Sequence, residues 1–288
     1  MKLLAIGNSL AENPLTYFRD CFPPALHEKV HVSYATIGGC TLERHANLAK
    51  FTGEHKSHKT YQTEFGGVAW PGSKGRIGNL QDVLQMEEWD FITLNQGSIL
   101  APRRESWEPW LGQLNALISR FAPKARIFLN MTWAYRDDAP YLVENGLTGD
   151  SMYSLLRGNY LHFAEKYQYG VIPTGEAIQR YRRSRAPRFE FPDPAFDYMH
   201  AKYPHVPIQK NDLSIGWYWQ VNDSPTGIPQ LVLDPNHLTV AGCYLAGCTW
   251  FGALGCGNPE HIAFVPSGLD QRLATELRKL ASDVTRSR

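Results

Sequence analysis

Three side chains of the types that carry out nucleophilic acyl transfer lie near the two ends of the sequence. Ser9 follows the apolar run Leu3–Ile6 and the turn residues Gly7-Asn8, while Asp234 and His237 precede an apolar helical stretch. A serine hydroxyl is a weak nucleophile unless an imidazole accepts its proton, and a carboxylate on the other imidazole nitrogen fixes the tautomer. Asp234 and His237, three residues apart, can both face inward from one turn. The sequence therefore contains the parts of a serine-based acyl-transfer site.

A simpler interpretation of Asn8-Ser9 is a helix cap. Both residue types favour the N-cap position, and considered alone the pair favours this interpretation. Two other segments favour catalysis, because the turn Gly38-Gly39 and the amide pair Asn95-Gln96 each follow a predicted strand. The oxyanion of acyl transfer needs preorganised donors, which backbone N–H groups and a carboxamide supply. Capping and catalysis are compatible, because a helix start places N–H groups beside the hydroxyl.

Apolar runs alternate with amphipathic segments along most of the chain. The predicted strands cover residues 3–6, 30–36, 91–94, 126–132, 170–172 and 230–233. The predicted helices cover about residues 12–22, 80–87, 107–121, 151–167, 176–183, 239–254 and 269–284. Strands that alternate with helices predict right-handed crossovers and a mostly parallel sheet. We therefore expect an α/β fold, a three-layer α/β/α sandwich around a five-stranded sheet, with the site at the carboxyl edge of that sheet.

Two stretches interrupt this alternation, at about residues 50–76 and 186–226. The first is rich in Gly, His, Lys and Thr, and its His55 and His58 favour a solvated loop or small hairpin over a metal site. The second combines six prolines with many aromatic side chains, which is typical of an ordered excursion rather than a disordered linker. These aromatic side chains suit either packing onto the sheet or stacking against a sugar ring. We interpret residues 1–288 as one domain with two insertions.

Charge and cysteine content exclude several classes of function. The 29 basic and 28 acidic residues nearly balance, so we expect no general attraction to nucleic acid or to an anionic membrane. No apolar run approaches the ~18 residues that span a bilayer, and the first apolar run is too short for a signal peptide. The five cysteines form no Cys-x-x-Cys pair, which disfavours a zinc or redox motif. We therefore expect reduced thiols in a cytoplasmic protein without a metal.

Four blocks of the sequence resemble, in order, the motif blocks of the SGNH (GDSL-like) hydrolase superfamily. They are the nucleophile block at residues 5–10, the glycine block at 37–40, the third block at 94–98 and the terminal block at 234–237. More closely, IGNS, IGGCTLERH, LNQGS, TWAY, IPTGEAIQ and DPNHLTVAGCYLAGCTWF are similar to a bacterial subgroup catalogued as a domain of unknown function. The resemblance spans residue 3 to about residue 255. It implies a flavodoxin-like fold and a serine hydrolase without a cofactor, usually an esterase or lipase and often a carbohydrate O-deacetylase.

The resemblance also implies roles for individual residues. Ser9 takes the position of the nucleophile, His237 that of the general base and acid, and Asp234 that of the carboxylate that orients the histidine. The backbone N–H groups of Ser9 and Gly39 take the positions of two oxyanion donors.

The third block departs from the usual Gly-x-Asn-Asp pattern of the superfamily. Either Asn95 or Gln96 can supply the third oxyanion donor, and we favour Gln96 because it lies beyond the strand end and the subgroup typically has Gln there. Further side chains for substrate binding are expected at Asn8, Arg44, Trp133 and Tyr135. The competing interpretations are bracing of the turn for Asn8, a surface ion pair for Arg44, and core packing for the two aromatic residues.

We therefore predict an SGNH-type serine esterase that hydrolyses a small or carbohydrate-linked carboxylic ester, including an O-acetyl ester, through an acyl-enzyme on Ser9. Its expected partner is a small-molecule or saccharide ester, with no cofactor, nucleic acid or membrane. One alternative is a non-catalytic carbohydrate-binding descendant of the fold, which the intact Ser9, Asp234 and His237 disfavour. A phosphoester hydrolase is the other alternative. The sequence disfavours it because no Gly-rich phosphate loop follows the first strand and no acidic metal cluster is evident.

Overall fold

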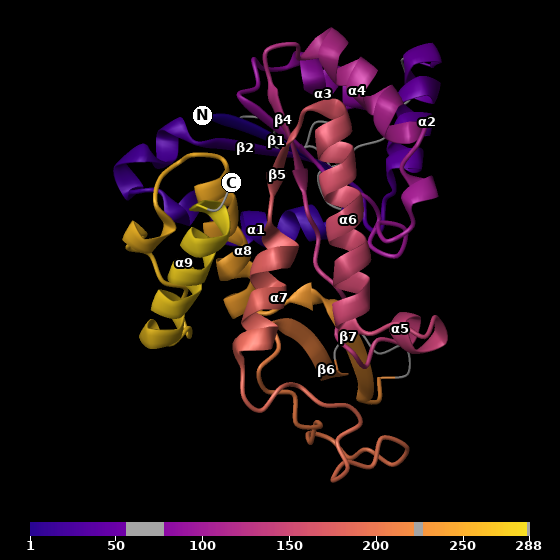
Figure 1. Ribbon diagram of the computed structural model, residues 1–288, viewed down its shortest axis with the longest axis vertical. Helices are drawn as coiled ribbons and strands as arrows, with labels where there is room; N and C mark the ends of the chain where they lie inside the picture. Colours follow the sequence, from indigo (N-terminus) through magenta and orange to yellow (C-terminus); the bar gives the residue numbers. More distant parts are fainter. Residues whose placement is uncertain (56–77, 222–226, 287–288) are drawn as a thin grey trace.

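A five-stranded parallel sheet forms the centre of the molecule (Figure 1). The computed structural model describes residues 1–55, 78–221 and 227–286. The strands of the sheet are β1 (Lys2–Gly7), β2 (His31–Thr36), β3 (Phe91–Leu94), β4 (Arg126–Asn130) and β5 (Gly170–Ile172). Their order is β2-β1-β3-β4-β5, with every neighbouring pair parallel. This is the flavodoxin-like order, whose direction reverses between β1 and β3, and ligands of such sheets bind outside the carboxyl ends at that reversal.

Helices cover both faces of the sheet. The helices are α1 (Ser9–Phe18), α2 (Leu42–Glu54), α3 (Leu80–Gln85), α4 (Trp110–Phe121), α5 (Pro140–Glu144), α6 (Gly149–Tyr167), α7 (Thr174–Ser184), α8 (Val240–Ala253) and α9 (Gln271–Arg286). Side chains of β1 alternate between two cores: Leu4 and Ile6 pack with α2, α3, α4 and α6, whereas Leu3 and Ala5 pack with α1, α7, α8 and α9. Figure 1 shows the first group to the right of the sheet and α8 and α9 to its left. The predicted three-layer sandwich is confirmed.

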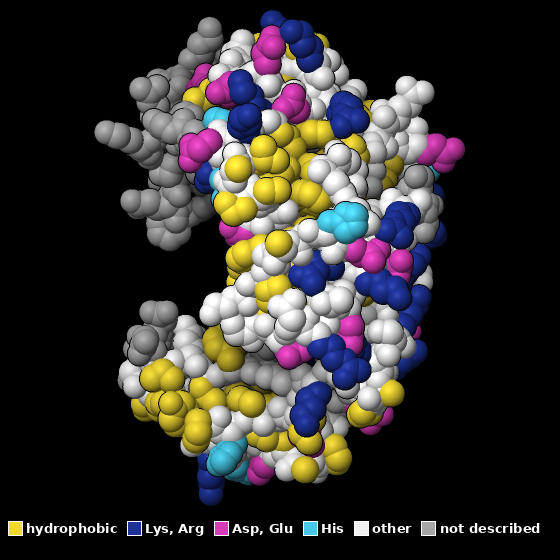
Figure 2. Space-filling view, turned by 90° about the vertical axis from the view of Figure 1, so that its left-hand side faces the viewer, with side chains coloured by type: hydrophobic (Ala, Val, Ile, Leu, Met, Phe, Trp, Pro, Cys, Tyr) yellow, Lys and Arg dark blue, Asp and Glu magenta, His cyan; other side chains and the backbone are white. Residues whose placement is uncertain are grey.

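A separate antiparallel pair, β6 (Ser214–Gln220) and β7 (Gln230–Leu238), lies beyond the carboxyl ends of β4 and β5 (Figure 1). It follows an irregular segment at residues 185–213 that Figure 1 shows at the bottom of the molecule. Large apolar side chains are exposed over this part of the chain, at Phe191, Met199, Tyr203, Val206, Ile208, Ile215, Tyr218, Val221 and Ile228. Figure 2 shows hydrophobic side chains gathered at the lower end of the molecule and a hollow in the surface above them. The hollow lies on one side of the molecule, and on the other side the lower part is continuous with the main body (Figure 2).

The structure contains several elements that the sequence patterns do not predict. Residues 42–54 form a helix although their apolar spacing is weak, and residues 214–220 form a strand inside the proline-rich stretch. The sequence pattern also ends the last strand at residue 233, whereas β7 continues to Leu238. Most of the predicted loop at residues 50–76, including His58, lies outside the described residues. Within the described ranges, every helix is too short or too polar to span a bilayer.

Candidate active site

Asn8 connects the three loops that follow β1, β2 and β3. It is the N-cap of α1, and its Oδ1 accepts hydrogen bonds from Leu10 N–H and from Asn95 Nδ2, both at 3.0 Å. Its Nδ2 donates to the carbonyl oxygens of Cys40 at 2.9 Å and of Gln96 at 3.4 Å. The side chain is 2% exposed, and every polar group on it is used within the protein. Asn8 therefore braces the start of α1, and its contact with a substrate stays a prediction.

Ser9 begins α1 at the carboxyl end of β1, and the structure brings Asp234 and His237 to it. Ser9 Oγ lies 2.8 Å from His237 Nε2, and His237 Nδ1 lies 2.8 Å from Asp234 Oδ2. Because an ionised carboxylate only accepts hydrogen bonds, Nδ1 carries the proton and Nε2 of the neutral ring accepts the serine proton. Asp234 Oδ1 also accepts the backbone N–H of His237 at 2.9 Å. The three side chains thus form one continuous hydrogen-bonded chain.

The Asp234–His237 pair shifts the pKa of both groups. The hydrogen bond that His237 donates to Asp234 raises the pKa of His237 above 6.5 and outweighs the opposite effect of burial, and the Asp234 and Glu12 charges add to it. Burial raises the pKa of Asp234, but the hydrogen bonds from His237 outweigh it, so the pKa lies below its ordinary value. Asp234 is therefore ionised near neutral pH, and it stabilises the protonated form of His237.

The carbonyl oxygen of Gly7, at the end of β1, accepts two hydrogen bonds. One comes from Ile37 N–H at 3.2 Å and one from His45 Nε2 at 2.9 Å. His45 lies on α2 and is fully buried, and burial lowers its pKa to about 4. A side chain at residue 7 would overlap Asn95, because a Cβ there would lie 2.0 Å from Asn95 Oδ1. The strand end before Ser9 is thus fixed by Gly7 and by a neutral histidine, His45, to which the sequence patterns assign no role.

The glycine turn after β2 is exposed, and Gly39 adopts a left-handed conformation with φ of 62°. The turn is closed by Cys40 N–H, which donates to the carbonyl of Ile37 at 3.0 Å. Among the hydrogen bonds between described residues, none is donated by the backbone N–H of Ser9 or of Gly39. Both groups therefore remain available to an anionic ligand at this edge of the sheet.

The amide pair after β3, which is predicted to supply the third oxyanion donor, makes its hydrogen bonds within the protein. Gln96 is fully buried, and its Nε2 donates to the carbonyl oxygen of Ser106 at 2.8 Å and to Ser106 Oγ at 3.2 Å. Its Oε1 accepts the N–H groups of Leu42 and Gly97. Asn95 Nδ2 is likewise engaged, by Asn8 Oδ1 and by the carbonyl of Gln96. In this arrangement the hydrogens of both amides are directed into the protein, and the role of Gln96 as oxyanion donor, with Asn95 as the alternative, stays a prediction.

Two other residues that are predicted to contact a substrate, Trp133 and Tyr135, are buried. Trp133 is 1% exposed, and its Nε1 donates to the carbonyl oxygen of Asn236 at 2.6 Å. Tyr135 is 8% exposed, packs edge-to-face on Tyr141, and shares a 2.5 Å hydrogen bond with Ser98 through its hydroxyl. Both rings pack in the core in this structure, and their contact with a substrate stays a prediction. Arg44 is exposed on α2, and its contact with a substrate carboxylate stays a prediction.

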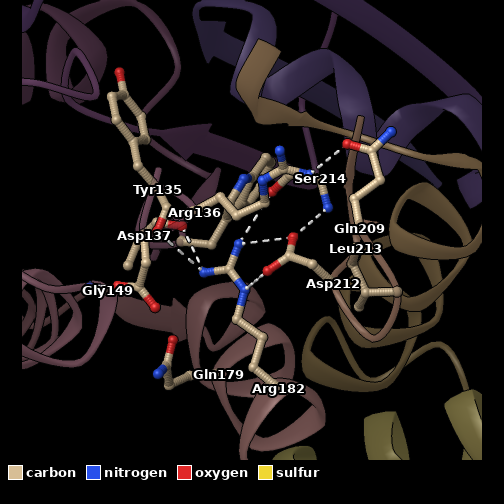
Figure 3. A network of polar contacts seen from close by, with 12 residues as sticks. Tyr135, Arg136, Asp137, Gly149, Gln179, Arg182, Gln209, Asp212, Leu213 and Ser214 are labelled. Atoms are coloured by element: carbon tan, nitrogen blue, oxygen red, sulfur yellow. Dashed lines mark hydrogen bonds and ion pairs between the residues drawn. The ribbon is translucent and has the colours of Figure 1, made fainter. Parts of the chain in front are cut away.

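A buried polar network connects the loop after β4 to the β6–β7 pair (Figure 3). Arg182 donates to the carbonyl oxygen of Ala134 at 2.8 Å and pairs with Asp212 at 2.8 Å. Arg136 pairs with Asp138 and donates to Gln209 Oε1 at 3.0 Å. These charges are paired and hydrogen-bonded, as buried ions must be to avoid a large desolvation cost. The network fixes the β6–β7 pair, and with it Asp234, against the central fold.

Gly216 allows Arg136 to lie against β6. It pairs with Asp234 across the two strands and has φ of 75°, and a Cβ there would lie 1.9 Å from Arg136 Nη1. The strand register shifts between Ser214 and Gly216, so the residues between Asp234 and Leu238 bulge out of the ladder. This bulge carries His237 toward Ser9.

No cluster of three or more His, Cys, Asp or Glu side chains with the spacing of a metal site occurs among the described residues. His58 lies outside the described residues, and His55 is the C-cap of α2 and stacks on Phe51. Taken together, the groups at the carboxyl edge of the sheet are a hydrogen-bonded Ser–His–Asp chain, two available backbone N–H groups and an exposed glycine turn.

Comparison with known proteins identifies relatives of this fold. A family model described as a domain of unknown function (DUF4886) matches residues 2–189, a region that contains Ser9 and ends before Asp234. A search of curated proteins found no match. A solved structure of a DUF4886 family protein from Bacteroides uniformis is 22% identical with a TM-score of 0.71, and the similarity covers 99% of this chain and 94% of that chain.

Two further solved structures are more distant. A protein from Slackia heliotrinireducens, described as a candidate SGNH hydrolase, is 17% identical with a TM-score of 0.51, over 88% of this chain and 99% of that chain. An acetylxylan esterase from Geobacillus stearothermophilus is 13% identical with a TM-score of 0.46, over 88% of this chain and 94% of that chain. The chain belongs to the DUF4886 family of domains of unknown function and has an SGNH-like hydrolase fold.

Proposed function

We propose that this protein is a serine hydrolase of carboxylic esters, with Ser9 as nucleophile, His237 as general base and acid, and Asp234 as the carboxylate that orients the histidine. The observation that carries this proposal is the unbroken hydrogen-bonded chain from Ser9 Oγ through His237 to Asp234, with 2.8 Å at each link. An SGNH-like fold, which hosts this chemistry in other proteins, is consistent with the assignment but does not by itself determine activity.

The proposed reaction follows from the protons on this chain. Ser9 Oγ attacks the ester carbonyl as its proton passes to His237 Nε2, and Asp234 stabilises the imidazolium that forms. The N–H groups of Ser9 and Gly39 bind the oxyanion of the tetrahedral intermediate. His237 then protonates the departing alcohol, which leaves the acyl group on Ser9. A water molecule, deprotonated by His237, hydrolyses this acyl-enzyme and restores the hydroxyl of Ser9.

The proposed substrate is a small or carbohydrate-linked ester, including an O-acetyl ester. Ser9 is partly exposed beside the glycine turn, and the triad residues Asp234 and His237 are also partly exposed. An open site of this kind is accessible to the ester of a saccharide, whose alcohol portion is bulky. A panel of acetylated sugars against p-nitrophenyl esters of increasing chain length measures this preference directly.

A fluorophosphonate probe tests the reaction type, because it reacts with an activated serine. We expect labelling of the wild-type protein and none of the Ser9→Ala or His237→Ala variants. Hydrolysis of the ester panel should disappear in the same variants. If the wild-type protein is neither labelled nor active on any ester, the catalytic proposal fails, and binding of acetylated sugars without turnover would favour a non-catalytic carbohydrate-binding protein.

A further inference from the structure

The position of His237 relative to Ser9 is not set by the central sheet. His237 lies on β7, and among the described strands β7 pairs with β6 in a sheet of its own. Ser9 instead follows β1, in the middle of the five-stranded sheet. The 2.8 Å contact between the two side chains therefore depends on interactions that fasten the bulged segment of β7 to the main body.

Two of these interactions come from the loop after β4. Trp133 Nε1 donates to the carbonyl oxygen of Asn236 at 2.6 Å, and Arg136 N–H donates to the carbonyl oxygen of Pro235 at 3.1 Å. The two acceptor residues, Pro235 and Asn236, lie between Asp234 and His237 in the sequence. Asn236 directly precedes His237, so its carbonyl belongs to the peptide that joins it to His237. The orientation of that peptide sets the direction in which the imidazole leaves the backbone.

The third interaction comes from the helix that carries the nucleophile. Asn13 lies about one helical turn after Ser9 on α1, and its Oδ1 accepts the backbone N–H of Leu238 at 2.9 Å. Leu238 directly follows His237. The peptides on both sides of His237 are therefore fastened by side chains, one from Trp133 and one from Asn13.

Trp133 is suited to hold a fixed position. It is 1% exposed and belongs to the core that packs beneath α1, α7 and α8. The backbone that follows it is held by Arg182, which donates to the carbonyl oxygen of Ala134 at 2.8 Å and pairs with Asp212 (Figure 3). A buried ring on a held backbone loses little conformational freedom when it makes a hydrogen bond. Because Trp133 is buried, it acts on the reaction only through Asn236.

We propose that Trp133 and Asn13 are positioning residues that hold His237 at the distance and angle needed to accept the proton of Ser9. The proposal rests on the proposed function. A displacement of about 1 Å in a catalytic group costs on the order of 100-fold in rate. Loss of either contact is therefore expected to lower kcat while leaving KM unchanged, because both side chains act on the backbone beside His237.

Trp133→Phe tests the tryptophan, since it removes the indole N–H and keeps an aromatic ring. Trp89→Phe is the matched control. Trp89 is 3% exposed, its Nε1 donates to the carbonyl oxygen of Val83 at 3.2 Å, and it precedes β3 at the opposite edge of the sheet. Fluorophosphonate labelling at saturation counts the folded sites in each preparation, so that kcat can be expressed per labelled site. A purely structural role would reduce the number of labelled sites and leave kcat per site unchanged.

We expect kcat per labelled site to fall on the order of 10- to 100-fold in Trp133→Phe, with KM unchanged, and to stay at the wild-type value in Trp89→Phe. Equal kcat per site in both variants would overturn the role of Trp133. Asn13 provides the second test: Asn13→Ala should lower kcat per site, whereas Asn13→Asp keeps the acceptor and should restore it. Identical values in these two variants would overturn the role of Asn13.

These outcomes separate the inference from the proposed function. If wild-type protein is labelled at Ser9 and hydrolyses esters, but Trp133→Phe and Asn13→Ala match it in kcat per site, the positioning proposal fails alone. If wild-type protein is neither labelled nor active, both proposals fail together.

Discussion

We expect His45 to make the free energy of unfolding depend on pH, and we expect the substitution His45→Gln to remove this dependence. The imidazole is fully buried on α2 and donates a hydrogen bond from Nε2 to the carbonyl oxygen of Gly7. Burial lowers its pKa to about 4, with the Arg44 charge acting in the same direction and the bond to Gly7 acting against it. In the unfolded chain the pKa returns to about 6.5. His45 is therefore neutral in the folded protein over a range in which the unfolded chain binds a proton.

The sign and size of the effect follow from this difference in pKa. Between pH 6.5 and about 4 the unfolded state binds more protons at His45, so the free energy of unfolding falls as the pH falls. Each pH unit within this window costs about 1.4 kcal/mol. Between about pH 7.5 and about pH 4.5 the expected loss from His45 is about 2.5 kcal/mol. The contribution of His45 is complete above pH 6.5 and disappears as the pH falls through the folded pKa.

His45→Gln removes the titrating group and keeps an amide that can donate toward Gly7. Urea unfolding, followed by tryptophan fluorescence at several pH values between about 7.5 and about 4.5, gives the free energy of unfolding of both proteins. We expect the wild-type protein to lose about 2.5 kcal/mol more than the variant over this interval. Other titrating groups are common to both proteins and cancel in the comparison. Parallel curves, within about 0.5 kcal/mol, would refute the account of His45 as a buried neutral histidine.

Three further predictions concern the site and its supports. Asp234→Asn should lower kcat on the order of 10⁴-fold. The wild-type enzyme should lose activity as the pH falls through the pKa of His237, which lies above 6.5, and in the variant this loss of activity should occur at lower pH. Loss of activity at the same pH in both proteins would contradict the pairing of Asp234 with His237. Gly216→Ala should cost more than about 2 kcal/mol in chemical unfolding, because a Cβ would lie 1.9 Å from Arg136 Nη1 at a backbone φ of 75°; a neutral result would show that Arg136 moves freely. Gln96→Leu should cost about 3 kcal/mol, since buried backbone N–H groups lose their acceptor; catalysis lost without a loss of stability would instead restore Gln96 as an oxyanion donor.

Local sequence patterns predict much of the central fold. Short apolar or alternating segments and the turn residues after them locate all five strands of the parallel sheet to within a few residues. The pattern fails for the helix at residues 42–54, whose apolar positions are sparse, and for the strand at residues 214–220. Among the described strands, that strand pairs with β7 alone, so its stability depends on a partner that lies later in the sequence.

In the candidate site, too, the sequence indicates some of the residues and only the structure reveals the others. The residue types and the resemblance of four blocks single out Ser9, Asp234 and His237, and the structure brings these three side chains together. Local patterns do not indicate which groups support them. Asn13 lies inside a helix and Trp133 follows a strand, so both look like ordinary structural residues until their partners on β7 are known.

The sequence by itself determined the fold class, the positions along the chain of the five strands of the central sheet, and the sheet edge at which the hydroxyl of Ser9 lies. These follow from periodicity and turn chemistry, which act over a few residues. Only the tertiary structure decided the direction of the amide pair after β3. Gln96 turns away from the site because a backbone N–H 54 residues distant, at Leu42, and the carbonyl of Ser106 satisfy its amide. A buried amide adopts the orientation in which its hydrogen bonds are made, and those partners are brought near only when the chain has folded.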